Sequence, residues 1–179
     1  SNNIDLYENH IIRGNAFKCS FVDYQGCICV GDCRHVKDLI IKNNVASLDE
    51  NKYFTYARGW AENCIIADNA VENCNCIAYF RKPSDDRGDN NVNKNIVIAN
   101  NVGSCYWYVA RLDDCNTLYD GVIISGNIFK YLATQNAMYR YTAYMQNKVY
   151  SKYPLIANND VTNVNGVTIY DGYIKKDVL

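Results

Sequence analysis

Short aliphatic runs recur along the chain, and each one ends in an asparagine. The residue three positions before that asparagine is Ile in all six runs, and the residue five positions before it is mostly apolar. Because alternate residues of a strand point to the same side, these two positions predict the buried side of a strand. The final asparagines lie 25 to 32 residues apart and are Asn15, Asn44, Asn69, Asn101, Asn127 and Asn159.

A repeat of this length predicts a solenoid. The final asparagine is expected to take a left-handed turn conformation, which Asn tolerates. Stacked from coil to coil, these side chains can form a hydrogen-bonded ladder. A new strand follows each bend, and another recurs about half a coil later, as in 76–80 and 106–109. The pattern predicts an all-β fold, a parallel β-helix of about six coils, in one domain over residues 1–179.

Two other architectures were weighed against the β-helix. Helical repeats need long segments of period 3.6, and the chain has none. An antiparallel β-sandwich explains many short strands, but it does not explain why Ile and Asn recur at fixed positions. The sandwich therefore stays open as the second choice of fold.

Charge and hydrophobicity narrow the classes of partner. The net charge is −1, from 18 basic and 19 acidic residues, whereas a general nucleic-acid binder is normally more basic. No apolar run approaches the roughly 20 residues of a membrane span. The chain begins with Ser, shows no signal peptide and has no clear polar cap at either end. We therefore expect a segment of a larger protein, with neither nucleic acid nor a membrane span.

The nine cysteines do not predict a complete set of disulfides, because their number is odd. Cys64 stands where other repeats have Leu, Ile or Val, which indicates a buried thiol. Cys27 with Cys29, and Cys74 with Cys76, have a one-residue spacing that differs from that of zinc knuckles. Residues two apart on a strand share a side, so packed thiols are favoured over a metal site.

The repeated Ile-x-Ile-x-x-Asn pattern resembles the pectate-lyase-like superfamily of right-handed parallel β-helices, over nearly the whole chain. The superfamily includes polysaccharide lyases, glycoside hydrolases, phage tail spikes and surface adhesins, many of which handle polysaccharide. The resemblance implies a right-handed coil, a polysaccharide partner, an extracellular, cell-surface or virion location, and calcium as a candidate cofactor.

A ridge of aromatic and basic residues is the first candidate site. Tyr rings can stack on sugar faces, and Arg pairs bidentately with carboxylates, which suits an acidic polysaccharide. The alternative is that the rings pack within the fold and each Arg is a solvated neighbour. The ridge residues are Tyr56, Arg58, Trp60, Tyr79, Arg81, Trp107, Tyr108 and Arg140.

Arg111, Asp113 and Asp114 are the catalytic candidates. The resemblance implies that an Arg can act as the base of a lyase, or paired Asp as the acid and base of a hydrolase. The fuller motifs Asn-Thr-Asp and Gly-His-Gly are missing, and adjacent Asp residues on a strand point to opposite sides. Residues 85–90 are acidic and contain Arg-Gly-Asp, but they lack EF-hand spacing, so we expect a solvated loop rather than a metal site.

The residue four positions before each final asparagine forms an outward aliphatic column. A column of this size on a solvated sheet would be a large apolar patch. A covering segment or side-by-side packing of several β-helices, as in trimeric tail spikes, would bury it. Carbohydrate binding is the leading function, a lyase or hydrolase is the alternative, and a structural shaft is the third reading. The column is Ile11, Ile40, Ile65, Val97, Ile123 and Leu155.

Overall fold

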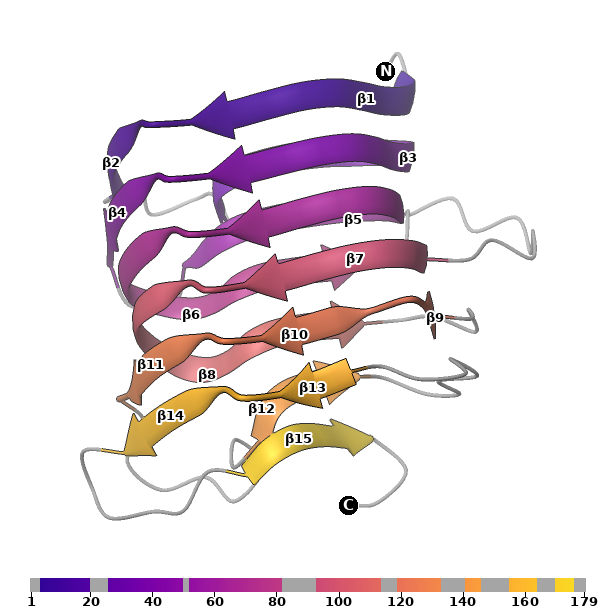
Figure 1. Ribbon diagram of the computed structural model, residues 1–179. Coiled ribbons are helices and arrows are strands. Elements are labelled where there is room, and N and C mark those ends of the chain that lie inside the picture. Colours follow the sequence, from indigo (N-terminus) through magenta and orange to yellow (C-terminus); the bar gives the residue numbers. More distant parts are fainter. Residues whose placement is uncertain are drawn as a thin grey trace.

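All paired strands in the described part of the chain run parallel and wind into a β-solenoid, as the computed structural model in Figure 1 shows. The structure describes residues 4–19, 26–49, 52–81, 93–113, 119–132, 141–145, 155–163 and 170–175. Each strand pairs with strands of the neighbouring turns rather than with its neighbour in sequence, except where β5 meets β6. The parallel pairing excludes the antiparallel sandwich and confirms the β-helix.

The strands form three stacks, one along each side of the coil (Figure 1). The first stack contains the aliphatic runs, which pair in the order β1, β3, β5, β7, β10 and β13. Their bounds are β1 (Ile4–Arg13), β3 (Gly26–Lys42), β5 (Tyr53–Ala67), β7 (Asn93–Ala99), β10 (Ile123–Ser125) and β13 (Leu155–Ala157), with β9 (Tyr119–Asp120) beside β7.

The second stack starts just after the asparagine bend, and the third stack follows it in each turn. The second stack contains β2 (Ala16–Cys19), β4 (Val45–Leu48), the first residues of β6 (Ala70–Arg81) and β8 (Val102–Asp113), β11 (Ile128–Tyr131) and β14 (Asp160–Asn163). The third stack contains the first residues of β3 and β5, the last residues of β6 and β8, β12 (Tyr141–Met145) and β15 (Tyr170–Lys175).

The solenoid has about four turns, fewer than the six coils expected. The first stack is six strands deep, so the sequence correctly located every aliphatic run. Residues 20–25, 133–140 and 164–169 lie outside the described residues. Counting asparagines therefore counts rungs of the first stack rather than complete turns.

The predicted asparagine ladder is present. The amide nitrogen Nδ2 of Asn69 donates to Oδ1 of Asn101 at 2.9 Å, and that of Asn101 donates to Oδ1 of Asn127 at 2.9 Å. The same Oδ1 atoms also accept the backbone N–H of the preceding asparagine, at 3.1 Å in both cases. From Asn44 onward, each Nδ2 donates its second hydrogen to an Ile carbonyl of the previous rung, for example Asn101 to Ile66 at 3.0 Å. A buried amide thereby has all of its hydrogen-bonding groups paired, which removes the cost of burying it.

The expectation that the final asparagine takes the left-handed conformation is wrong. The positive φ angles belong to the residue before it, as at Asn43 (55°), Asn100 (54°) and Gly126 (65°). The final asparagine itself is needed inside the bend for the ladder, so its neighbour makes the left-handed turn. A second left-handed position, five residues before the first, was not expected; it is occupied by Asn9, Asp38, Asn63, Asn95 and Gly121.

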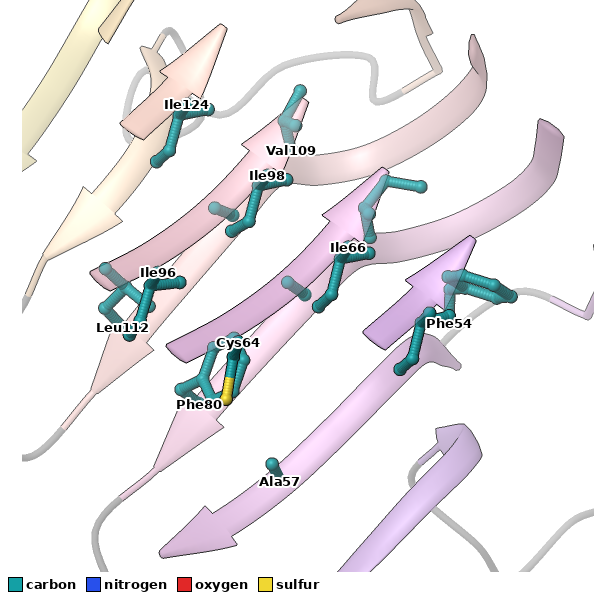
Figure 2. Close-up of a cluster of buried hydrophobic side chains, with 14 of the residues drawn as sticks. Phe54, Ala57, Cys64, Ile66, Phe80, Ile96, Ile98, Val109, Leu112 and Ile124 are labelled. Atoms are coloured by element: carbon teal, nitrogen blue, oxygen red, sulfur yellow. The ribbon is translucent and has the colours of Figure 1, made fainter. Parts of the chain in front are cut away.

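The core lies inside the coil and takes side chains from all three stacks, among them Leu48, Val71 and Phe129 of the second. Figure 2 shows Cys64 of the first stack beside Phe80 of the third, and Ile96 of the first stack beside Leu112 of the third. Cys64 and Ile96 are fully buried, as expected from the column five residues before each asparagine. Phe80 and Leu112, which neither column predicts, are buried as well. Each fully buried Ile contributes roughly 1.5–3 kcal/mol by leaving water. Within the aliphatic runs of the first stack, the inward Ile residues fix the side to which the residues between them point.

Candidate functional site

A cluster of aromatic residues lies on the outer side of the third stack, separate from the main core. It arises because the register stacks Tyr56 on Tyr79, and Tyr79 next to Arg111, on successive rungs. The ring centroids of Tyr56 and Tyr79 are 5.3 Å apart, and those of Tyr53 and Tyr79 are 4.7 Å apart. These are contact distances for aromatic pairs. The aromatic cluster consists of Tyr53, Tyr56, Tyr79, Trp107, Tyr108 and Tyr144.

Arg111 lies against three rings of this cluster. Its guanidinium carbon Cζ is 4.8 Å from the ring centroid of Tyr79, 5.4 Å from that of Trp107 and 5.5 Å from that of Tyr144. All three distances are within the range of cation–π attraction, which favours the charged guanidinium. The side chain is only partly buried. Arg111 therefore holds a fixed positive charge at the surface of the aromatic cluster, whereas a catalytic base needs its neutral form.

Two further arginines lie beside the aromatic cluster on the same side of the third stack. Arg58 is directly in register with Arg81, one rung apart. Each lies two residues after a cluster tyrosine, so strand alternation places it on the outer side. Both side chains are partly buried. The backbone register continues to Asp113 beyond Arg81 and to Asp32 beyond Arg58, so acidic residues occupy the neighbouring rungs.

The three tyrosines of the predicted ridge lie together, but their rings are largely inaccessible. Tyr56, Tyr79 and Tyr108 are 7%, 6% and 2% exposed, so their ring faces pack on one another and are not open for a sugar. Trp60 lies in the main core rather than in the aromatic cluster. Trp107 is the ridge residue whose ring is partly exposed.

The remaining predicted site residues cannot all be placed. Asp113 ends strand β8, but its side chain is not described. Asp114 and Arg140 lie outside the described residues, as does the acidic segment 85–90. Among the described residues, the structure thus brings Arg58, Arg81 and Arg111 to one surface and leaves the carboxylates of the catalytic hypothesis untested.

Sequence reasoning missed Tyr53 and Tyr144 as members of the aromatic cluster. The signal was present, because both lie in the recurring aromatic strands 53–56 and 141–144. It could not be used without knowing the bend in each strand. Phe54 points into the core while Tyr53 and Tyr56 point outward, so the side of a residue does not follow from alternation alone.

The outward aliphatic column is in register over all six rungs, as predicted. Its end members Ile11 and Leu155 are 62% and 54% exposed, and its middle members are partly buried by their neighbours. Three residues of the adjoining second stack are also exposed, namely Val45, Val102 and Ile128. The edge between the first and second stacks therefore presents aliphatic side chains to solvent.

Among the described residues, no group of three or more His, Cys, Asp and Glu side chains is arranged to hold a metal ion. The same part of the chain contains no helix with the length and hydrophobicity to cross a bilayer. Within it, Cys64, Cys74 and Cys105 are buried free thiols of the main core. Cys76 packs instead against the aromatic cluster. The expectation that Cys74 and Cys76 share a side is therefore wrong, because a register shift falls between them.

Comparisons with known proteins add no relative to these observations. No family model, no curated protein and no solved structure matches the chain.

Proposed function

We propose that this β-solenoid binds an acidic polysaccharide on the outer side of its third stack. The observation that carries the proposal is the grouping of Arg58, Arg81 and Arg111 on successive rungs beside a partly exposed Trp107. Guanidinium groups pair bidentately with carboxylates, and an indole can pack against the apolar side of a sugar ring. A polymer running along the solenoid axis would meet these groups in turn.

The proposal agrees with the polysaccharide partner that the resemblance to the pectate-lyase-like superfamily implies. It places the chain within a larger surface or tail-spike-like protein that meets polysaccharide outside the cell or on a virion. The aromatic cluster supports it by providing a rigid base. Rings that pack on one another, with Arg111 held by three of them, leave little side-chain freedom to lose when a ligand binds.

The test compares a short polyuronate with the same oligosaccharide after its carboxyl groups have been reduced to alcohols. Calorimetric titration at low salt is expected to show binding of the polyuronate and at least tenfold weaker binding of the reduced form. The double variant Arg58→Gln, Arg81→Gln is expected to lose most of the difference between the two. Raising the ionic strength should weaken binding, because exposed charge pairs are screened.

Arg13→Gln is the matched control for these variants. Arg13 is exposed and lies on the first stack, so the substitution removes the same charge from a different side. Its polyuronate affinity should equal that of the unmodified protein. Equal affinity for the charged and reduced sugars, or equal loss in the control and the double variant, would contradict the proposal.

A lyase or hydrolase activity is the alternative, with Arg111, Asp113 and Asp114 as its residues. It predicts new reducing ends in the titrated polyuronate, with an ultraviolet-absorbing double bond if the reaction is an elimination. Calcium would be added in a parallel reaction. Binding without either product leaves the recognition proposal alone.

The exposed aliphatic edge favours a second, structural function, in which several copies pack side by side. Ile65 lies in the middle of the outward column, so Ile65→Asp would place a charge within any such contact. If the copies associate through this column, sedimentation should show a trimer for the unmodified protein and a monomer for the variant. Asp substitution at Lys130, an exposed polar position on the second stack, is the control.

A further inference from the structure

Two thiols meet near the N-terminal end of the solenoid. Cys19 is the last residue of β2, and Cys27 is the second residue of β3. Their sulfur atoms are 2.8 Å apart, and both side chains are partly buried against the main core. The end of a second-stack strand and the start of a third-stack strand therefore bring the two thiols together.

The other described thiols have different surroundings. Cys64 is directed at the backbone carbonyls of Val36 and Glu62, with sulfur–oxygen distances of 3.7 and 3.5 Å. Cys74 is directed at the carbonyl of Ser104, 3.5 Å away. Cys29 is exposed on the outer side of β3. Within the described residues, a sulfur–sulfur contact is thus shown for Cys19 and Cys27.

We propose that Cys19 and Cys27 are a disulfide-forming site that small-molecule disulfides oxidise. In the first step a thiolate of the pair attacks a sulfur of the small disulfide, and one small thiolate leaves. In the second step the other protein thiol, after losing its proton, displaces the second small thiolate. Two protein thiols and one small disulfide thus become one protein disulfide and two small thiols, so atoms and electrons balance.

Cys27 is a slow attacking group at neutral pH. Burial is the main cause that raises the pKa of the Cys27 thiol well above its ordinary value, and the hydrogen bond and charge of Cys19 act in the same direction. The attacking species is the thiolate, so the rate of oxidation should rise with pH. Proximity of the two sulfurs then makes the second, intramolecular step fast relative to escape of the mixed disulfide.

The bond would close a ring that contains residues 20–25 and fasten β2 to β3. Cross-linking of the unfolded chain over a ring of this size is expected to raise the thermal midpoint by roughly 5 °C. The effect falls on the first turn, where β1 pairs with β3 on one side only among the described residues. Oxidation would therefore fasten the first described turn of the solenoid.

The experiment incubates the intact protein with oxidised glutathione, quenches with acid, alkylates the remaining thiols and maps the peptides. The expected result is a peptide pair joined through Cys19 and Cys27, and a loss of two hydrogen masses from the intact protein. The thermal unfolding midpoint should rise on oxidation and fall again when reductant is added. Cys29, which is exposed, should be alkylated or carry glutathione without joining either partner.

Cys29→Ser is the matched control and should give the same joined pair. Cys27→Ser should abolish it and leave Cys19 as an alkylated or glutathione-bearing residue. Stable glutathione adducts on both Cys19 and Cys27 in the folded protein, or bonds from either to another cysteine, would overturn the proposal. The map of the unmodified protein decides the outcome even if a variant does not fold.

Discussion

Replacing Asn101 by Ala removes the central link of the asparagine ladder. Asn101 is fully buried, and its side chain makes four hydrogen bonds. It accepts from the backbone N–H and from Nδ2 of Asn69, and it donates to the carbonyl of Ile66 and to Oδ1 of Asn127. The substitution therefore affects three neighbouring rungs at once.

The cost follows from the groups left behind. The backbone N–H and the Nδ2 group of Asn69 stay buried and lose their shared acceptor, and each unpaired buried donor costs about 1–3 kcal/mol. The lost donations to Ile66 and Asn127 and the space left by the amide add to this. We expect a loss of roughly 3–5 kcal/mol in the free energy of unfolding, a large part of the ~5–15 kcal/mol of a typical domain.

Asn15→Ala is the comparison, because Asn15 is the exposed end of the same ladder. Its Nδ2 donates to Asn44 at 3.1 Å, but Asn44 keeps the backbone N–H of residue 15 as a donor. Solvent can pair the remaining groups, so the loss should stay below about 1 kcal/mol. Urea unfolding followed by far-ultraviolet circular dichroism measures both. Equal losses at the two positions would refute the reasoning that burial of the amide sets the cost.

Three further predictions concern the backbone, the core and pH. Gly103→Ala should cost at least about 3 kcal/mol or prevent folding, because Gly103 has φ +145° and an added Cβ would lie 1.8 Å from the carbonyl oxygen of Val71; thermal unfolding measures it, and a loss below about 1 kcal/mol would show that the strand can shift. Ile98→Ala should cost about 2–5 kcal/mol in urea, because the side chain is fully buried; a loss the size of that at exposed Ile11→Ala would contradict the core assignment. Burial raises the pKa of the Cys105 thiol from 9.0 to about 12; the folded state holds this proton more tightly, so its contribution is complete below pH 9.0 and is lost as pH rises toward 12. Above pH 9.0, the free energy of unfolding should therefore fall less steeply with pH in Cys105→Ala than in the unmodified protein. An unchanged slope would contradict the raised pKa of the Cys105 thiol.

The fold was predictable because one physical rule governs every rung. Ile at a fixed distance from a buried asparagine marks the inner side of a strand, and neighbouring rungs share both columns. The left-handed position was missed because two adjacent residues, such as Asn100 and Asn101, are chemically alike. The signal that separates the two positions is the glycine at the turn position of two repeats, Gly14 and Gly126.

The candidate site was only partly predictable, because the third stack bends. Tyr56 lies on the outer side and Ala57 in the core, so alternation continued to Arg58 places Arg58 on the outer side. It fails between Phe54 and Tyr56, which lie on opposite sides although they are two residues apart. It fails again between Cys74 and Cys76, where a register shift moves a residue to the other side. Burial of the tyrosine rings depends on contacts between rungs, which a single strand's sequence does not contain.

The central claim is that polyuronate binds beside the aromatic cluster, and the two tryptophans allow a direct test. Trp107 is partly exposed next to Arg111, whereas Trp60 is buried in the main core. The indole N–H signals of the two residues are to be followed by nuclear magnetic resonance during titration with a short polyuronate. The proposal predicts a saturable shift of the Trp107 signal and a nearly constant Trp60 signal. Saturable binding that leaves the Trp107 signal in place would contradict it.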